Sequence, residues 1–230
     1  SKATFEVGKT PVYIAAMHGH VGAIESLVRL GADFNQAIIT HGTTPVKIAA
    51  KKGHVDAIDS LVKHGASVNT CNNDGFSPAS VAAERNHVSV LKLLSQHDAD
   101  LDKAAHCGKT PFFCAVERLS LDAIDFLHTC GACINTPDKD GVSPAHVAAR
   151  NDSVAVLKLL HNWGADFFVR NNDGATPLDV AGRDAIAFLQ NVDASAGSAT
   201  ATPSTASAGV GADAKCAVQE IAKGGPRVFA

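Results

Sequence analysis

Cysteine and histidine are the residues of this chain whose chemistry could support catalysis or metal binding. The sequence contains 6 cysteines and 11 histidines, and two residues separate Cys130 from Cys133. Redox dithiols and zinc sites both use this C-x-x-C spacing. A redox dithiol needs a βαβ context, which the sequence lacks. A zinc site needs two further ligands, for which Cys107 and Cys114 are the candidates.

The surroundings of these residues favour structural roles. Cys114 occupies a position that recurs along the chain and is otherwise aliphatic, at Ile14, Ile48, Val81 and Val147. No histidine has an evident Ser or Cys nucleophile and carboxylate partner, and neither a phosphate-loop glycine pattern nor H-E-x-x-H is present. We therefore predict no catalytic residue, no cofactor and no metal site, and we do not expect an enzyme.

Most of these cysteines and histidines lie within a repeated element. A Thr-Pro or Ser-Pro pair marks each copy of this element and recurs at nearly constant spacing. The pairs are Thr10-Pro11, Thr44-Pro45, Ser77-Pro78, Thr110-Pro111, Ser143-Pro144 and Thr176-Pro177. They are separated by 34 residues once and by 33 residues thereafter. A period of this size indicates a stacked repeat protein, in which each unit packs on its neighbours.

Each unit is predicted to contain two short helices joined by a turn. Pro fits the first position of a helix, and the Thr or Ser before it can cap that helix. An Ala pair follows, and beyond the turn apolar residues recur at helical spacing, as in Val55, Ile58 and Leu61. The fourth unit has Leu119 where the other turns have Gly, Asn or Asp, which predicts a strained or remodelled turn.

The repeated unit, G-x-[TS]-P-x-x-x-A-A-x-x-G-H-V-x-x-I-x-x-L-V-x-x-G-A-x-x-N, resembles the ankyrin repeat. The resemblance covers six units over residues ~5–190. It implies an all-α solenoid of stacked helix-turn-helix units with β-turn or hairpin loops. It also implies structural hydrogen bonds at the turn from His20, His54 and His87, and it places His146 at the histidine of the family's T-P-L-H motif.

Two units depart from this pattern. One extra residue lies between the first and second units near Ile38 and Ile39, which predicts an apolar loop tip. The sixth unit lacks about four residues at its inter-helix turn, as an atypical terminal unit can.

The two ends of the chain carry further expectations. The first unit has core-type residues in place of a polar cap, namely Val12, Ile14, Ile24 and Leu27, so we expect further units before Ser1. Residues 193–230 are rich in Ala, Ser, Thr and Gly and predict a flexible tail after a repeat domain of residues 1–192. A brief helix is predicted at 215–223.

Charge and hydropathy narrow the class of protein. The net charge of −3 argues against a dedicated nucleic-acid binder, and no apolar run reaches the ~18 residues of a membrane span. No secretory signal opens the chain, and a chain of this length does not need disulfides. We predict a monomeric protein whose thiols are mostly free. We expect it in the cytoplasm, with the nucleus as the alternative location.

The residues that follow each Ala pair are predicted to line the concave groove, where the resemblance implies partner binding. They are Met17-His18, Lys51-Lys52, Glu84-Arg85, Glu117-Arg118 and Arg150-Asn151. His18, Lys52, Arg85 and Arg118 form what we call the basic row. Because packed helices lie about 8–10 Å apart, this row could dock a partner with an acidic segment. The alternative is a solvated surface whose charges pair with one another.

Loop tips are the second class of predicted contact residues. Phe76 and Lys109 each follow a glycine that precedes a Ser/Thr-Pro pair. Exposed aromatic residues dominate many interfaces, so Phe76 is the strongest anchor candidate. Its alternative role is packing against the neighbouring loop.

The sequence thus predicts a scaffold or adaptor that binds another protein. One alternative is that the chain is the adaptor portion of a larger enzyme, channel or ubiquitin-ligase-type protein. The other is a metal protein or enzyme that uses the cysteines and histidines, which stoichiometric zinc in the folded protein would favour. Within a stacked array, Leu61→Asp in a middle unit should unfold more of the chain than a similar change in the sixth.

Overall fold

The computed structural model describes residues 8–197, with side chains up to residue 192. Within these residues there are 11 helices and no strand, which confirms the predicted all-α class. The helices are α1 Pro11–Met17, α2 Val21–Arg29, α3 Pro45–Lys52, α4 Val55–Lys63, α5 Pro78–Glu84, α6 Val88–Gln96, α7 Pro111–Glu117, α8 Leu121–Thr129, α9 Pro144–Arg150, α10 Val154–Asn162 and α11 Arg183–Gly197. Most of the predicted tail, including its helix at 215–223, lies outside the described residues.

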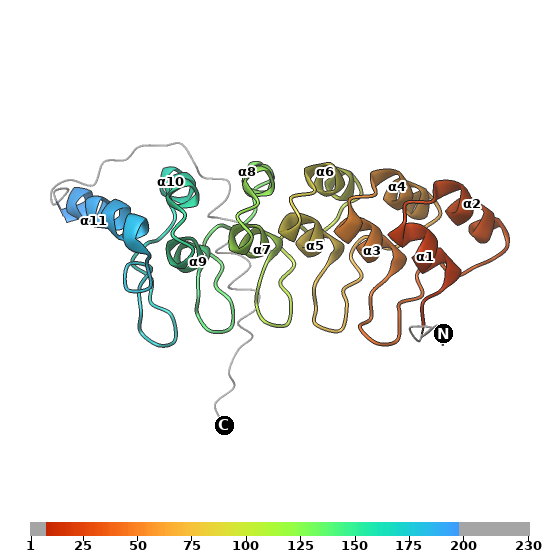
Figure 1. Ribbon diagram of the computed structural model, residues 1–230, viewed down its shortest axis with the longest axis horizontal. Helices are drawn as coiled ribbons and strands as arrows, with labels where there is room; N and C mark the ends of the chain where they lie inside the picture. The colour runs from red at the N-terminus through yellow and green to blue at the C-terminus, as the bar shows by residue number, and fades with distance from the viewer. Residues whose placement is uncertain (1–7, 198–230) are drawn as a thin grey trace, which may run out of the picture. The chain divides into compact units, whose positions relative to one another are not determined.

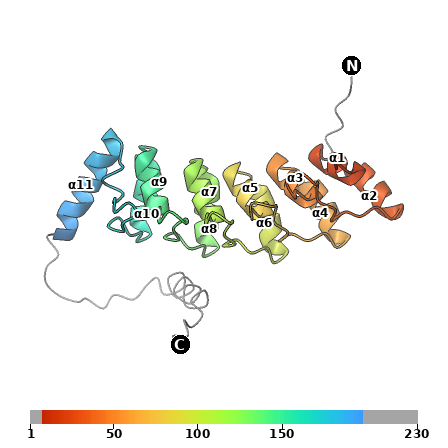
Figure 2. The ribbon, with the colours of Figure 1, turned by 90° about the horizontal axis from the view of Figure 1, so that it is seen from below.

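The chain divides into two compact units, residues 1–126 and residues 127–230. In the first unit, α1, α3, α5 and α7 form an inner layer in which each helix packs on the next. Helices α2, α4 and α6 form an outer layer, and each outer helix packs on the inner helix that precedes it (Figure 1; Figure 2). This is the predicted helix-turn-helix stacking.

The first five Thr-Pro and Ser-Pro pairs start the inner helices, as the sequence predicts. In α3 the hydroxyl of Thr44 accepts a hydrogen bond from the backbone N–H of Lys47 at 3.3 Å, and Pro45 takes the first helical position. Such a cap typically stabilises a helix by about 1 kcal/mol. Ala49 and Ala50 are fully buried, because their small side chains allow the neighbouring helices to approach closely.

The turns between inner and outer helices adopt left-handed backbone conformations. Gly53 ends α3 with φ +79°, and Asn86, Leu119 and Asp152 follow α5, α7 and α9 with φ between +55° and +57°. The strained turn predicted at Leu119 is therefore confirmed. Asn86 makes use of its turn, because its side-chain oxygen accepts from Ala123 N at 2.9 Å in the first turn of α8. Leucine cannot replace that bond.

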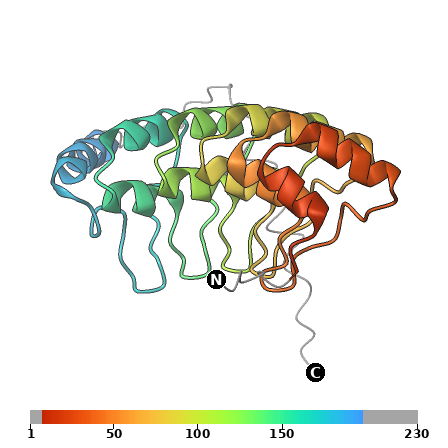
Figure 3. The ribbon, with the colours of Figure 1, turned by 45° about the vertical axis from the view of Figure 1, so that its right-hand side comes forward.

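Hairpin loops connect successive repeats and extend from the inner layer (Figure 3). Within the first unit, neighbouring hairpins are joined by backbone hydrogen bonds. Asn73 N donates to His41 O at 3.1 Å, and His106 N donates to Asp74 O at 2.9 Å. The hairpins thus form a continuous border beside the inner helices.

The second unit contains α9, α10 and α11, which pack on one another. Here the inner helix of the last repeat is replaced by a turn at residues 177–180. The chain then enters α11 directly, with Gly182 N bonded to Ala149 O at 3.0 Å and Asp152 Oδ1 accepting from Ala185 N at 2.7 Å. The departure expected at the inter-helix turn of the sixth unit thus extends to its first helix, and the prediction that each unit contains two short helices is wrong for this unit.

Two predictions about apolar residues of the first unit are wrong. Ile14 was expected in the core but is 43 % exposed. Among the described elements α1 packs on α2 and α3, whereas α3 is flanked by both α1 and α5. Ile38 was expected at a loop tip but is buried, because its side chain lines a cavity with Tyr13 and Ile48; Ile39 is exposed.

Candidate functional site

The cysteine chemistry considered from the sequence does not assemble in the described residues. Cys114 is buried in α7, and burial raises the pKa of its thiol to about 12, so a thiolate is scarce at neutral pH. Cys130 is an exposed free thiol and is therefore not bonded to Cys133, which is buried. Among the residues that the structure describes, no three His, Cys, Asp or Glu side chains are grouped to hold a metal ion.

The turn histidines connect neighbouring repeats. Nε2 of His54 donates to Met17 O at 3.1 Å, and Nε2 of His87 donates to Lys51 O at 3.3 Å. Ser120 takes the same position in the fourth repeat and donates to Glu84 O at 3.3 Å. The structural role expected of His54 and His87 is confirmed, but their bonds join adjacent repeats instead of closing one turn. Since each bond ends on an inner-helix carbonyl, these residues fix where those helices end.

His146 also has a structural role. It is buried near the start of α9, where Ser143 N and His146 Nδ1 complete a capping box. Its Nε2 donates to Ala175 O at 2.9 Å in the following hairpin. Both ring nitrogens are thus used to hold a helix and a loop together.

Charged side chains gather where the inner helices of the first unit end. Glu84 lies 3.2 Å from Arg118 and 3.9 Å from Arg85, and Lys109 lies 2.8 Å from Glu117. Arg118 remains 61 % exposed in its ion pair. Two members of the basic row, Arg85 and Arg118, therefore share the Glu84 carboxylate. This arrangement is compatible with a row that binds a partner and with a surface whose charges pair with one another.

The other predicted contact residues are distributed over both units. His18 and Lys52 are exposed, and the ring of His18 stacks on that of His20 at 5.8 Å. Met17 is half-buried at the end of α1. Arg150 is exposed at the end of α9 in the second unit and is considered with that unit alone.

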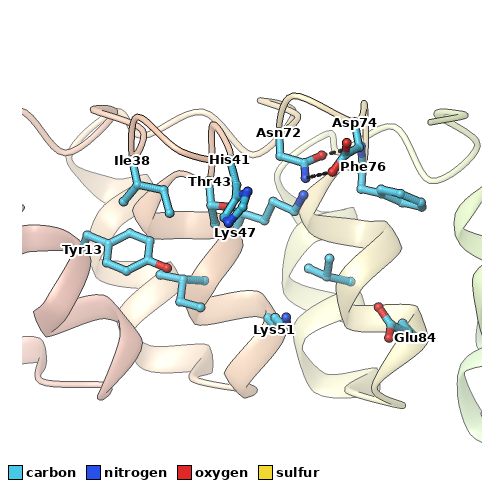
Figure 4. A pocket seen from close by; sticks show the side chains of 12 residues that line it. Tyr13, Ile38, His41, Thr43, Lys47, Lys51, Asn72, Asp74, Phe76 and Glu84 are labelled. Carbon is cyan, nitrogen blue, oxygen red and sulfur yellow. Dashed lines mark hydrogen bonds between the residues drawn. The ribbon is translucent and has the colours of Figure 1, made fainter. Parts of the chain in front are cut away.

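A cavity of about 300 Å³ opens between the inner helices and the hairpins of the first unit (Figure 4). It brings together three of the predicted contact residues, Lys51, Phe76 and Glu84. The remaining lining residues are Tyr13, Ile38, His41, Thr43, Lys47, Ile48, Asn72, Asp74 and Val81. The cavity has both apolar walls and charged groups, so it can hold an amphipathic side chain. We call it the Lys47 pocket.

Lys47 is the residue of this pocket that the sequence analysis missed. It is only 4 % exposed, and its Nζ lies 5.9 Å from the centroid of the Phe76 ring. Burial lowers the pKa of its ammonium group to about 8, despite the opposing effects of nearby Cys71, Asp74 and Glu84. The available signal was a lysine inside a helix segment otherwise made of core residues, Pro45–Ala50. Sequence alone does not tell whether such a lysine extends its charge to solvent.

Comparison with known proteins agrees with this architecture. The profile of the family described as ankyrin repeats (3 copies) matches residues 2–72, 47–138 and 80–171. No match was found among curated proteins. Ankyrin repeats are generally protein–protein interaction modules and are typically non-catalytic. None of the described helices combines the length and the apolar character needed to span a membrane. Because the matched segments cover most of its length, the chain belongs to the ankyrin repeat family.

Proposed function

We propose that this chain acts as a scaffold or adaptor and binds a partner protein through the inner-helix ends and hairpins of its first unit. One observation carries the proposal. Helices α3, α5 and α7 are neighbours in the inner layer, and a pair of charged residues stands at the carboxyl end of each. The pairs are Lys51-Lys52, Glu84-Arg85 and Glu117-Arg118. Repeat stacking holds these side chains at fixed spacing, so binding needs little ordering of this surface.

The charges of this surface favour a partner with an acidic segment. Four of the six side chains are basic, and only Glu84 and Glu117 are acidic. In the ion pairs with Glu84, the side chains of Arg85 and Arg118 are 50 % and 61 % exposed, so solvent screens these pairs and a partner's carboxylates can compete for the two arginines. We therefore expect binding that weakens with salt.

A charge-reversal experiment tests this proposal. Partners captured by the wild-type chain are identified, purified and titrated against a Lys52→Glu, Arg85→Glu, Arg118→Glu variant. A matched control reverses Arg29, Lys63 and Lys92, which lie on the outer helices α2, α4 and α6 and change the net charge equally. Loss of at least about tenfold in affinity for the first variant alone supports the proposal. Equal affinity of the wild type and both variants contradicts it.

The remaining predictions are not tested by these observations. They are the domain boundary at residue 192, the monomeric state and the cytoplasmic location. Arg150 likewise stays a predicted contact residue of the second unit.

A further inference from the structure

We propose that the Lys47 pocket binds the carboxylate side chain of a single Asp or Glu of the partner protein. This inference rests on the proposed function and makes it specific. It names one residue as the recognition group and one chemical group as its ligand. The basic row would then supply general attraction, and the pocket would supply selectivity.

The Lys47 ammonium group has a ring contact with Phe76 but no hydrogen-bond or ion-pair partner in the described part of the chain. The residue as a whole is nevertheless only 4 % exposed. Its side chain runs along the pocket towards Asn72 and the Phe76 ring (Figure 4). Ser60 Oγ, and not Lys47 Nζ, is the fully buried side-chain polar atom without a partner among the described residues, so the Lys47 stem is buried while its ammonium end opens into the pocket. A positive charge in such a pocket is stabilised by an opposite charge, so an external anion fits this position.

The neighbouring acidic residues do not already fulfil that role. Asp74, in the hairpin, accepts a hydrogen bond from Asn72 Nδ2 at 3.1 Å. Glu84, at the end of α5, is engaged by Arg118 at 3.2 Å and makes no ion pair with Lys47. The other titratable groups around Lys47 are His41 in the preceding loop, Lys51 on α3 and Cys71 ahead of the hairpin. None of these lies within ion-pair distance.

The equivalent residues of other repeats show that this arrangement is not a requirement of the fold. Ser80 bonds to the capping Ser77 at 3.0 Å, and Asp179 accepts from Thr176 Oγ1 at 2.8 Å. His146 uses both of its ring nitrogens, as described above. These side chains are satisfied within their own repeat or the next, whereas the polar end of Lys47 is directed into the pocket.

The pocket fits a carboxylate better than a phosphate group. Its cavity of about 300 Å³ has apolar walls from Tyr13, Ile48 and Val81, against which the methylene groups of Glu can pack. Lys47 and Lys51 are balanced by Asp74 and Glu84, so the lining has no excess of positive charge to offset the second negative charge of a phosphate group. The walls and the charge balance therefore both favour an Asp or Glu side chain.

The test uses the full chain and a displayed library of random twelve-residue peptides. Selected peptides are synthesised, and each acidic residue is replaced in turn by its amide, Glu by Gln or Asp by Asn. Affinities are measured for the wild type, for Lys47→Met, and for Lys92→Met, a control on the outer helix α6 that lies outside the pocket lining and the basic row. We expect one acidic position whose amide weakens binding about tenfold or more to the wild type and to Lys92→Met, but less than about twofold to Lys47→Met.

The other outcomes separate the two proposals. Peptides whose binding depends on the basic row but not on any carboxylate–Lys47 coupling would overturn the pocket inference and leave the proposed function standing. Failure to select any peptide that binds the first unit would count against both. Tighter binding of a phosphoserine peptide at the coupled position would overturn the choice of carboxylate. For a carboxylate ligand, affinity should fall as the pH rises through about 8, where Lys47 loses its charge.

Discussion

Lys47 and His146 occupy the same position of their respective repeats, three residues after the capping Thr44 or Ser143. Both are buried, with exposures of 4 % and 2 %. The imidazole of His146 is bonded to its own helix start and to the following hairpin, whereas the ammonium group of Lys47 has no such bond in the described residues. We therefore expect the same position to stabilise the second unit and to lower the stability of the first.

This difference suggests how one repeat fold carries both stability and recognition. A buried group with all its hydrogen bonds made contributes to folding, and a buried group without them costs free energy. Proteins often tolerate such a cost at binding sites. In this chain the unsatisfied group faces a pocket beside the charged inner-helix ends, which is where a ligand could satisfy it.

A lysine placed in the core, where no pocket can receive its charge, should lower the free energy of unfolding most. Leu61 in α4 is fully buried, so Leu61→Lys places an ammonium group in the core with no cavity to receive it. We expect the free energy of unfolding to fall by about 4 kcal/mol or more, measured by urea denaturation followed by circular dichroism. A loss below about 1 kcal/mol would show that the core tolerates lysine in general and that the pocket is not needed to explain Lys47.

Removal of the His146 imidazole, whose ring nitrogens are both hydrogen-bonded, should lower the free energy of unfolding by the next largest amount. His146→Ala leaves the Ala175 carbonyl without its donor and removes half of the capping box of α9. The expected destabilisation is about 2–3 kcal/mol, seen as a lower midpoint in denaturant. His106→Ala, at an exposed hairpin position, is the control and should change stability by less than about 0.5 kcal/mol. Equal effects of the two would contradict the assigned role of His146.

Lys47→Met should act in the opposite direction and stabilise the free protein. The pKa of Lys47 is lowered from 10.5 to about 8, so at pH 7 the amine is still mostly charged in the folded chain, but its charged form is less favourable there than in the unfolded chain. The gain should be about 1–3 kcal/mol at pH 7. Between pH 8 and 10.5 the unfolded chain binds more protons, so wild-type stability rises with pH and the advantage of Met disappears. A destabilised Lys47→Met chain at pH 7 would refute this account of the pocket.

The exposed ion pairs should matter least for stability. Arg118→Ala removes the 3.2 Å contact with Glu84, and the expected loss is below about 1 kcal/mol because solvent screens the pair. Thermal unfolding at low and high salt checks this value. A larger loss would mean that the charged helix ends serve folding instead of binding.

The regular part of the fold was predictable from local rules, and the site was predictable only in part. The Thr-Pro and Ser-Pro pairs place the inner helices, and the identity of Leu119 alone predicts its strained turn. These features depend on neighbours in sequence. The exposure of Ile14, the sharing of Glu84 by two arginines and the orientation of Lys47 depend on contacts between residues from different repeats. Sequence periodicity shows which residues occupy equivalent positions, but it does not show whether a long side chain reaches solvent, a partner or a cavity.

The most direct measurement is the titration of Lys47 itself, followed through its side-chain ¹³Cε signal by NMR and assigned with Lys47→Met. The account predicts a pKa near 8 in the free protein and a rise when a carboxylate peptide binds, because the bound anion favours the charged amine. A titration near the ordinary value of 10.5 in the free protein would mean that Lys47 is already solvated or paired, and would contradict the account.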